Sequence, residues 1–190
     1  MPGVPGALRR LLCLCKASFL ILLLLFLPIP GHTLLEVDFS SGNVFFLLRD
    51  GEAIHLAWKN SLFGQQVTEK FVARGGVLWL EEVKFEDRDS GYTMEATPRD
   101  LADLYHTGGA FRVEGVHRPF NRVVFRVGEA GRPFLTVKGR ELSFYDEAGF
   151  GGKVVLRAGR VRLISLLRAS GAALARRLLF LLLSFRQGAP

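Results

Sequence analysis

The sequence predicts an all-β fold, an antiparallel sandwich or small barrel of about nine or ten short strands. Between residues 43 and 156, short apolar or alternating segments are separated by turns rich in Gly, Asp, Asn and Pro. Long helices that could connect parallel strands are missing from this region. Apolar stretches with basic flanks lie on both sides of it, so we expect three parts: residues 1–33, 34–160 and 161–190.

The first half of the β region contains four or five expected strands. The segment 44–49 ends at Asp50-Gly51, a strong hairpin signal, and the next strand places Ile54, Leu56 and Trp58 on one face. Residues 67–74 end at Gly75-Gly76. They are followed by expected strands over 77–85 and 92–97.

The second half begins with the one short helix that we expect in the domain, over residues 98–105, with Pro98 in its first turn. Strands resume over 110–117 and 121–127, and the second of these places Val123, Phe125 and Val127 on one face. Residues 134–145 read as a hairpin with Gly139-Arg140 as its two-residue loop, and 153–157 closes the series.

The N-terminal segment predicts a membrane helix. Residues 17–30 are almost entirely apolar and follow Arg9, Arg10 and Lys16, which indicates a cytoplasmic N-terminus and an exported domain. We expect an uncleaved anchor in the cytoplasmic membrane, with a cleaved signal peptide as the alternative. Cys13 and Cys15 precede the apolar core and are interpreted as apolar filler, so no disulfide supports the exported domain.

The C-terminal segment predicts a basic amphipathic helix over residues 161–185. Its apolar face includes Leu167, Leu174 and Leu178, whereas Arg176 and Arg177 lie on the opposite face. A full span would bury both arginines, so we expect contact with the membrane surface or with a membrane partner. A helix docked on the domain's own sheet is the alternative.

The charge distribution argues against a nucleic-acid partner. The chain carries +7 overall, but residues 35–160 hold 17 basic and 18 acidic residues, a formal charge of −1. The excess lies in the two tails, where it flanks apolar segments. Nucleic-acid binders place such an excess on the folded surface that meets phosphate.

No strong catalytic or cofactor motif is present, so we expect a protein that is not an enzyme and needs no cofactor. Nucleophile-elbow, zinc-protease and phosphate-loop patterns are missing from the sequence. Residues 85–92 are rich in acids but lack the spacing of a calcium loop, and each of the four histidines stands alone, so we expect no metal site.

One corner of the β region, Asn60 to Glu69, stands out. Turn-forming residues connect two strands, and Glu69 alternates with Val67 and Phe71, so its carboxylate is expected to face inward. An inward carboxylate needs a partner. The simplest interpretation is that Glu69 holds its own loop; a binding site that includes Asn60, Ser61 and Glu69 is the second. The third is a hydrolase with Ser61 as nucleophile, although no nearby base is visible.

Four long segments of the chain carry a family resemblance: LAWKNSLFGQQVTEKF (56–71), GGVLWLEEVKFED (75–87), GAFRVEGVHRPFNRVVFRVG (109–128) and LTVKGRELSFYDEAGFGGKVVLR (135–157). Together they resemble domain-of-unknown-function family 1850. The short motif of this family is matched by Ser61, Val67, Glu69 and Phe71. Asn60 stands where the family usually has histidine, and Gln66 where proline is common.

The resemblance implies a membrane-anchored protein with a β-rich exported domain. Proteins of this family are commonly encoded beside TRAP-type transporter permeases that work with TAXI-type solute receptors. We therefore expect a non-enzymatic accessory protein whose partners are membrane lipid and a transporter permease or its solute receptor. The alternative is a binding module for a small solute or lipid that uses the Asn60–Glu69 corner.

Overall fold

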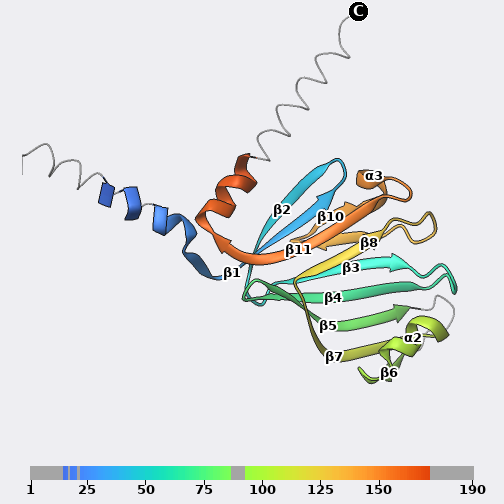
Figure 1. The fold of residues 1–190 in the computed structure, drawn as a ribbon. Helices are drawn as coiled ribbons and strands as arrows, with labels where there is room; N and C mark the ends of the chain where they lie inside the picture. Colours follow the sequence, from blue (N-terminus) through green and yellow to red (C-terminus); the bar gives the residue numbers. More distant parts are fainter. Residues whose placement is uncertain (1–14, 17, 21, 87–92, 172–190) are drawn as a thin grey trace, which may run out of the picture. The chain divides into compact units, whose positions relative to one another are not determined.

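The computed structural model describes residues 15–16, 18–20, 22–86 and 93–171, and these residues form a mostly β fold (Figure 1). Their eleven strands are β1 (Pro28–Phe39), β2 (Gly42–Arg49), β3 (Ala53–Lys59), β4 (Gln66–Arg74), β5 (Val77–Glu86), β6 (Met94–Ala96), β7 (Phe111–Phe120), β8 (Arg122–Arg126), β9 (Phe134–Val137), β10 (Arg140–Ser143) and β11 (Lys153–Arg162). Two short helices, α2 (Leu101–Thr107) and α3 (Phe144–Ala148), interrupt the series. The sequence patterns had singled out no strand before Val44, so β1 is an addition to the prediction.

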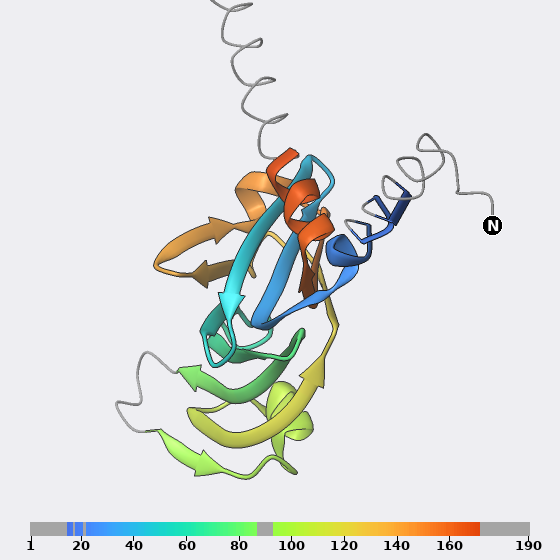
Figure 2. The same ribbon diagram turned by 90° about the vertical axis from the view of Figure 1, so that its left-hand side faces the viewer.

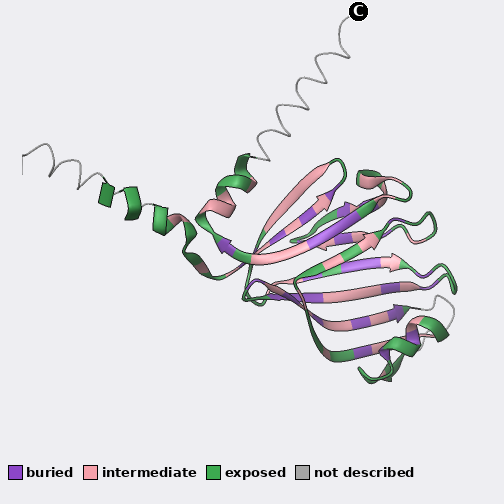
Figure 3. Ribbon diagram, viewed as in Figure 1, coloured by how far each residue is buried: buried purple, intermediate pink, exposed green. Residues whose placement is uncertain are grey.

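The strands form two sheets around a common core, as in an all-β sandwich. One sheet has the order β2-β1-β11-β8 and the other β10-β9-β3-β4-β5-β7-β6, and both can be followed in Figures 1 and 2. The core draws on both, for example Leu35 and Leu156 from the first sheet and Leu56 and Phe71 from the second. Figure 3 shows buried positions recurring along the strands, as alternating apolar sequence requires.

One pairing differs from the expected antiparallel pattern, because β6 pairs with β7 in parallel, with Met94 opposite Phe111. Residues 97–110, which include α2, connect the two strands. A parallel pair needs a crossover of about a dozen residues, and α2 provides it. The predicted helix exists, but it runs from Leu101 to Thr107 rather than over 98–105, so Pro98 precedes it instead of lying in its first turn. The sequence did not indicate that this helix would connect a parallel pair.

The predicted hairpin near the C-terminal end of the domain is shifted by one residue. Val137 pairs with Arg140, so the two-residue loop is Lys138-Gly139 rather than Gly139-Arg140. Both loop residues have positive φ, 51° and 72°, as a type I′ turn requires. The expected strand to Tyr145 ends at Ser143, whose hydroxyl accepts a hydrogen bond from the amide of Asp146 and begins α3.

A bulge in β5 sets which side chains of the large sheet face the core. The pairing with both neighbouring strands skips Glu81, between Leu80 and Glu82. The extra residue resets the alternation, so that Leu80 and Val83 are both buried although three positions separate them. Glu81 and Glu82 consequently lie together on the other face.

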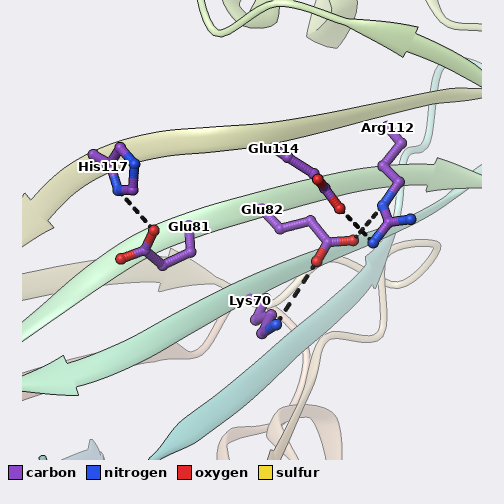
Figure 4. Close-up of polar contacts among 6 residues, drawn as sticks. All are labelled: Lys70, Glu81, Glu82, Arg112, Glu114 and His117. Carbon is purple, nitrogen blue, oxygen red and sulfur yellow. Dashed lines mark hydrogen bonds and ion pairs between the residues drawn. The ribbon is translucent and has the colours of Figure 1, made fainter. Parts of the chain in front are cut away.

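That outer face of β4, β5 and β7 carries a series of ion pairs (Figure 4). Glu82 lies 2.8 Å from Nε of Arg112 and 3.9 Å from Nζ of Lys70, and Arg112 also contacts Glu114 at 2.6 Å. The hydrogen bond to Glu82, and then the charges of Glu82 and Glu114, hold the pKa of Arg112 above its usual value. Acids and bases alternate across the three strands, which favours their pairing.

The predicted terminal segments extend beyond the described residues. Among the residues that the structure places, no helix combines the length and the apolar character required to cross a bilayer. Much of the expected anchor, including Cys13, lies outside the described ranges, as do Leu174, Arg176, Arg177 and Leu178. Residues 163–171 are helical, and within them Leu167 is exposed.

Candidate functional site

Asn60 organises the loop that joins β3 to β4. Its amide donates to the carbonyl of Gln65 at 2.8 Å, and its carbonyl accepts from the amide of Gly64 at 2.7 Å. The side-chain Oδ1 of Asn60 accepts from the amide of Leu62 at 2.9 Å. Asn60 is buried, and these bonds satisfy its polar groups, as a buried amide requires. The side chain of Asn60, one of the predicted site residues, is therefore engaged in a hydrogen bond that holds its own loop.

The loop rests on the end of α2. Nδ2 of Asn60 donates to the carbonyl of Tyr105 at 3.5 Å, and the amide of Gly109 donates to Oε1 of Gln65 at 3.1 Å. The ring of Phe63 packs over Gly108, whose φ is +67°; a Cβ built there would lie 2.7 Å from that ring. Glycine is required at this position both by the backbone and by the contact. The β3–β4 loop and α2 therefore form one packed corner.

Tyr105 is the centre of this corner. Its hydroxyl donates a hydrogen bond of 2.7 Å to Oε1 of Glu69. Its ring stacks on Trp58, with centroids 6.1 Å apart and an interplanar angle of 12°, and meets Phe85 edge-on at 5.1 Å. The predicted inward direction of Glu69 is confirmed, but its partner is Tyr105 of α2 and not the loop that follows β3.

Burial controls the electrostatics of this pair. Desolvation raises the pKa of Glu69, and the hydrogen bond from Tyr105 and then the nearby indole N–H of Trp58 oppose the rise. Burial and then the charge of Glu69 move the pKa of Tyr105 far above its usual value. Tyr105 is thus a neutral donor at physiological pH. The Trp58 Nε1 atom is buried and lacks an aligned hydrogen-bond acceptor among the described residues, so its effect on Glu69 is that of a nearby dipole.

A cavity of about 550 Å³ opens beside the aromatic stack. Trp58, Tyr105 and Phe125 supply its aromatic surface, together with Pro133. Polar and charged side chains also line it, namely Lys59, Asn60, Ser61, His106, Arg126 and Glu129. The elements that meet here are the end of β3, α2, the end of β8 and the loop from 127 to 133.

The three predicted site residues occupy different places around this cavity. Asn60 and Ser61 line it, and Ser61 is exposed to solvent. Glu69 does not line the cavity; its carboxylate accepts the hydrogen bond from Tyr105, which does line it. The structure therefore brings Ser61 to an open cavity and sets Glu69 beneath it.

The described residues give no arrangement of a nucleophile and its base at Ser61. No hydrogen bond joins Ser61 to a histidine or carboxylate within the described part of the chain. In the same residues, no group of three or more His, Cys, Asp and Glu side chains is placed to hold a metal ion. What the arrangement provides chemically is an aromatic surface, hydrogen-bonding groups and both signs of charge, which are the features of a binding pocket.

Sequence reasoning missed two components of this site. Tyr105 was placed only at the end of the expected helix, and Trp58 only on an apolar strand face. The signal that could have joined them is the inward Glu69, since a buried carboxylate needs a donor and Tyr105 is an aromatic donor on an apolar helix face. The contribution of the 127–133 loop had no such signal.

Comparison with known families identifies the segment that contains this site. Residues 54–144 match a family described as Domain of unknown function (DUF1850). No curated protein and no solved structure matches the chain. The matched segment runs from β3 to the start of α3, so it includes every strand of the seven-stranded sheet and the Trp58–Tyr105–Glu69 cluster.

Proposed function

We propose that this chain, whose residues 54–144 form a DUF1850 domain, is a non-enzymatic binding module that holds a small solute in the cavity beside Trp58 and Tyr105. The observation that carries the proposal is the rigid aromatic surface of that cavity. A cavity of about 550 Å³ falls within the range of small-molecule sites.

The support for the aromatic surface comes from three directions. The Glu69 carboxylate fixes the hydroxyl of Tyr105, Phe85 packs on the edge of its ring, and Trp58 stacks on its face. Rings that are already ordered lose little conformational entropy when a ligand arrives. The bound solute is therefore one with a flat or compact apolar body, and the polar lining residues orient it.

Tryptophan fluorescence tests this proposal directly, because the chain has two tryptophans. In the full chain carrying Trp79→Phe, all tryptophan emission comes from Trp58 at the cavity. Titration with benzyl alcohol or p-cresol is expected to change this emission saturably. The matched variant Trp58→Phe, which keeps Trp79 on β5, is expected to show no such change. A linear response in the first variant, or equal responses in both, would contradict the proposal.

A second role, as an accessory of a TRAP-type solute transporter, is supported by the family and by the apolar, basic ends of the sequence. In this role the domain lies outside the cytoplasmic membrane and its terminal segments contact lipid or the permease. Affinity purification of the tagged full chain in mild detergent, read by mass spectrometry, tests it. Recovery of a permease or its solute receptor is expected, and recovery that is lost without residues 161–190 would assign the contact to that segment. A well-folded chain that recovers neither would count against the role.

A further inference from the structure

A second cavity of about 610 Å³ lies between α2 and the second half of β7. It shares Tyr105 and His106 with the first cavity, and its other lining residues come from 98–102 and 116–119. None of these other residues belongs to the Asn60–Glu69 corner. We call this second cavity the α2–β7 groove.

The polar lining of the α2–β7 groove has one sign of charge. Arg99, His106, His117 and Arg118 line it, and no Asp or Glu is among its described lining residues. Nearby carboxylates are already engaged: Glu81 contacts His117 Nδ1 at 2.7 Å and Arg74 at 2.9 Å. Asp100 accepts from the hydroxyl of Thr97 at 2.6 Å, and its charge also interacts with that of the neighbouring Arg99. Arg99 and Arg118 therefore line the groove with no carboxylate among its described lining residues.

Two of these side chains, Arg118 and His117, are held in place. The guanidinium of Arg118 lies 5.4 Å from the ring centroid of Phe120, a cation–π contact. Its charge also reaches Tyr105, whose pKa it lowers against the stronger effects of burial and Glu69. His117 has a φ of +49°, which is unfavourable for a residue other than glycine, and its bond to Glu81 fixes the imidazole. Strain of this kind is often kept where a side chain must point in one direction.

The remaining lining of the α2–β7 groove is apolar. Leu101 and Ala102 of α2 lie on one side, and Val116 and Pro119 of β7 on the other. Leu101 is buried, whereas Ala102 and Pro119 are exposed to an incoming molecule. A ligand in this groove therefore contacts both apolar side chains and arginine. A purely hydrophilic anion would make no favourable contact with the apolar side chains.

We propose that the α2–β7 groove binds a small organic anion, a carboxylate on a compact apolar body. The carboxylate meets the guanidinium groups of Arg99 and Arg118, which match its planar geometry. The apolar body lies against Val116 and Pro119. This site goes beyond the solute cavity at Trp58, which carries both signs of charge in its lining.

The ¹⁹F NMR signal of 4-fluorobenzoate, recorded with the full chain in dodecyl maltoside micelles, tests the proposal. Wild-type protein is expected to broaden the signal saturably, and benzoate is expected to reverse the broadening, whereas benzyl alcohol, its uncharged analogue, is not. The double variant Arg99→Gln/Arg118→Gln is expected to weaken binding about tenfold, since hydrogen bonds to charged groups are among the stronger ones. Arg126→Gln is the matched control, because it removes a guanidinium from the other cavity.

The outcomes separate the two cavities. Unchanged affinity in the double variant overturns the proposal, and so does full competition by benzyl alcohol. Loss of binding in Arg126→Gln alone would place the anion in the Trp58 cavity, which also overturns it. Because the tryptophan experiment reports on Trp58 and this one on the two arginines, either proposal can fail while the other holds.

Discussion

Glu69 and Glu82 lie on neighbouring antiparallel strands, but the fold treats their carboxylates in opposite ways. Glu82 is opposite Lys70 on the outer face of the sheet, where Lys70 and Arg112 neutralise it (Figure 4). Glu69 is opposite Val83, which is fully buried, and its partner is the neutral hydroxyl of Tyr105. A carboxylate among cations is an ordinary feature of a sheet surface, since such pairs contribute little stability. The buried carboxylate of Glu69 instead fixes the ring of Tyr105, which indicates that the position of this ring matters.

Removal of the Tyr105 ring is expected to cause the largest loss of stability. Tyr105→Ala loses the stacking on Trp58 and the edge contact with Phe85, and it leaves the buried Glu69 carboxylate without its donor. We expect a loss of about 3 kcal/mol in the free energy of unfolding, measured by urea denaturation. Tyr145→Ala is the control, because this half-buried tyrosine of α3 lies under Arg132 and its hydroxyl has no hydrogen bond to a carboxylate among the described residues. It is expected to cost about half as much, and equal losses would contradict the special role of Tyr105.

Removing only the hydroxyl of Tyr105 separates the hydrogen bond from the ring. Tyr105→Phe is expected to lower the free energy of unfolding by about 1–2 kcal/mol, because Glu69 stays buried without a donor. In a Glu69→Leu background the same substitution is expected to cost much less, since the acceptor is already gone. A double-mutant cycle measures the difference as a coupling energy. Additive losses would mean that the 2.7 Å contact adds nothing to stability.

The pH dependence of stability distinguishes Glu69 from the carboxylates of the outer face. Burial raises the pKa of Glu69 in the folded state above its ordinary value of 4.5, so the folded protein binds this proton more readily than the unfolded chain. The resulting stabilisation is complete below pH 4.5 and is lost as the pH rises through the raised value. Glu69→Gln removes this dependence while keeping an acceptor for Tyr105. Chemical denaturation between pH 4 and pH 8 should therefore show that the free energy of unfolding of Glu69→Gln increases relative to that of the wild type as the pH rises. A difference in unfolding free energy that is independent of pH would refute the assignment.

The inward direction of Glu69 could be predicted because it follows from local alternation. Val67 and Phe71 are apolar, and a strand places every second residue on the same face. Most strands and the helix α2 could be predicted for the same reason, since their patterns are complete within ten residues or fewer. The hairpin loop was misplaced by one residue because both Lys138-Gly139 and Gly139-Arg140 contain the glycine that such a turn favours.

The partner of Glu69 could not be predicted because it is set by the fold. Tyr105 is 36 residues away, and α2 reaches the corner only because it crosses between the parallel strands β6 and β7. The bulge at Glu81 is equally invisible, since the run from Leu80 to Val83 reads as ordinary strand sequence. The sequence therefore singled out Asn60, Ser61 and Glu69 as candidates but gave no signal that Trp58 and Tyr105 lie beside them.

The smallest loss of stability is expected for a substitution on the outer face of the sheet, and this substitution should leave the Trp58 cavity unchanged. Glu82→Gln removes the partner of Arg112 and Lys70, so we expect a loss of stability smaller than that of Tyr105→Phe. One molar salt should abolish this loss, because the Debye length falls to about 3 Å and the cations of the half-exposed pairs are screened. The Tyr105–Glu69 pair is buried and involves a neutral donor, so the Tyr105→Phe deficit should persist in the same salt. Benzyl alcohol should change the Trp58 emission of Glu82→Gln as it changes that of the parent, and a loss of this response would mean that the ionic face supports the cavity through the sheet.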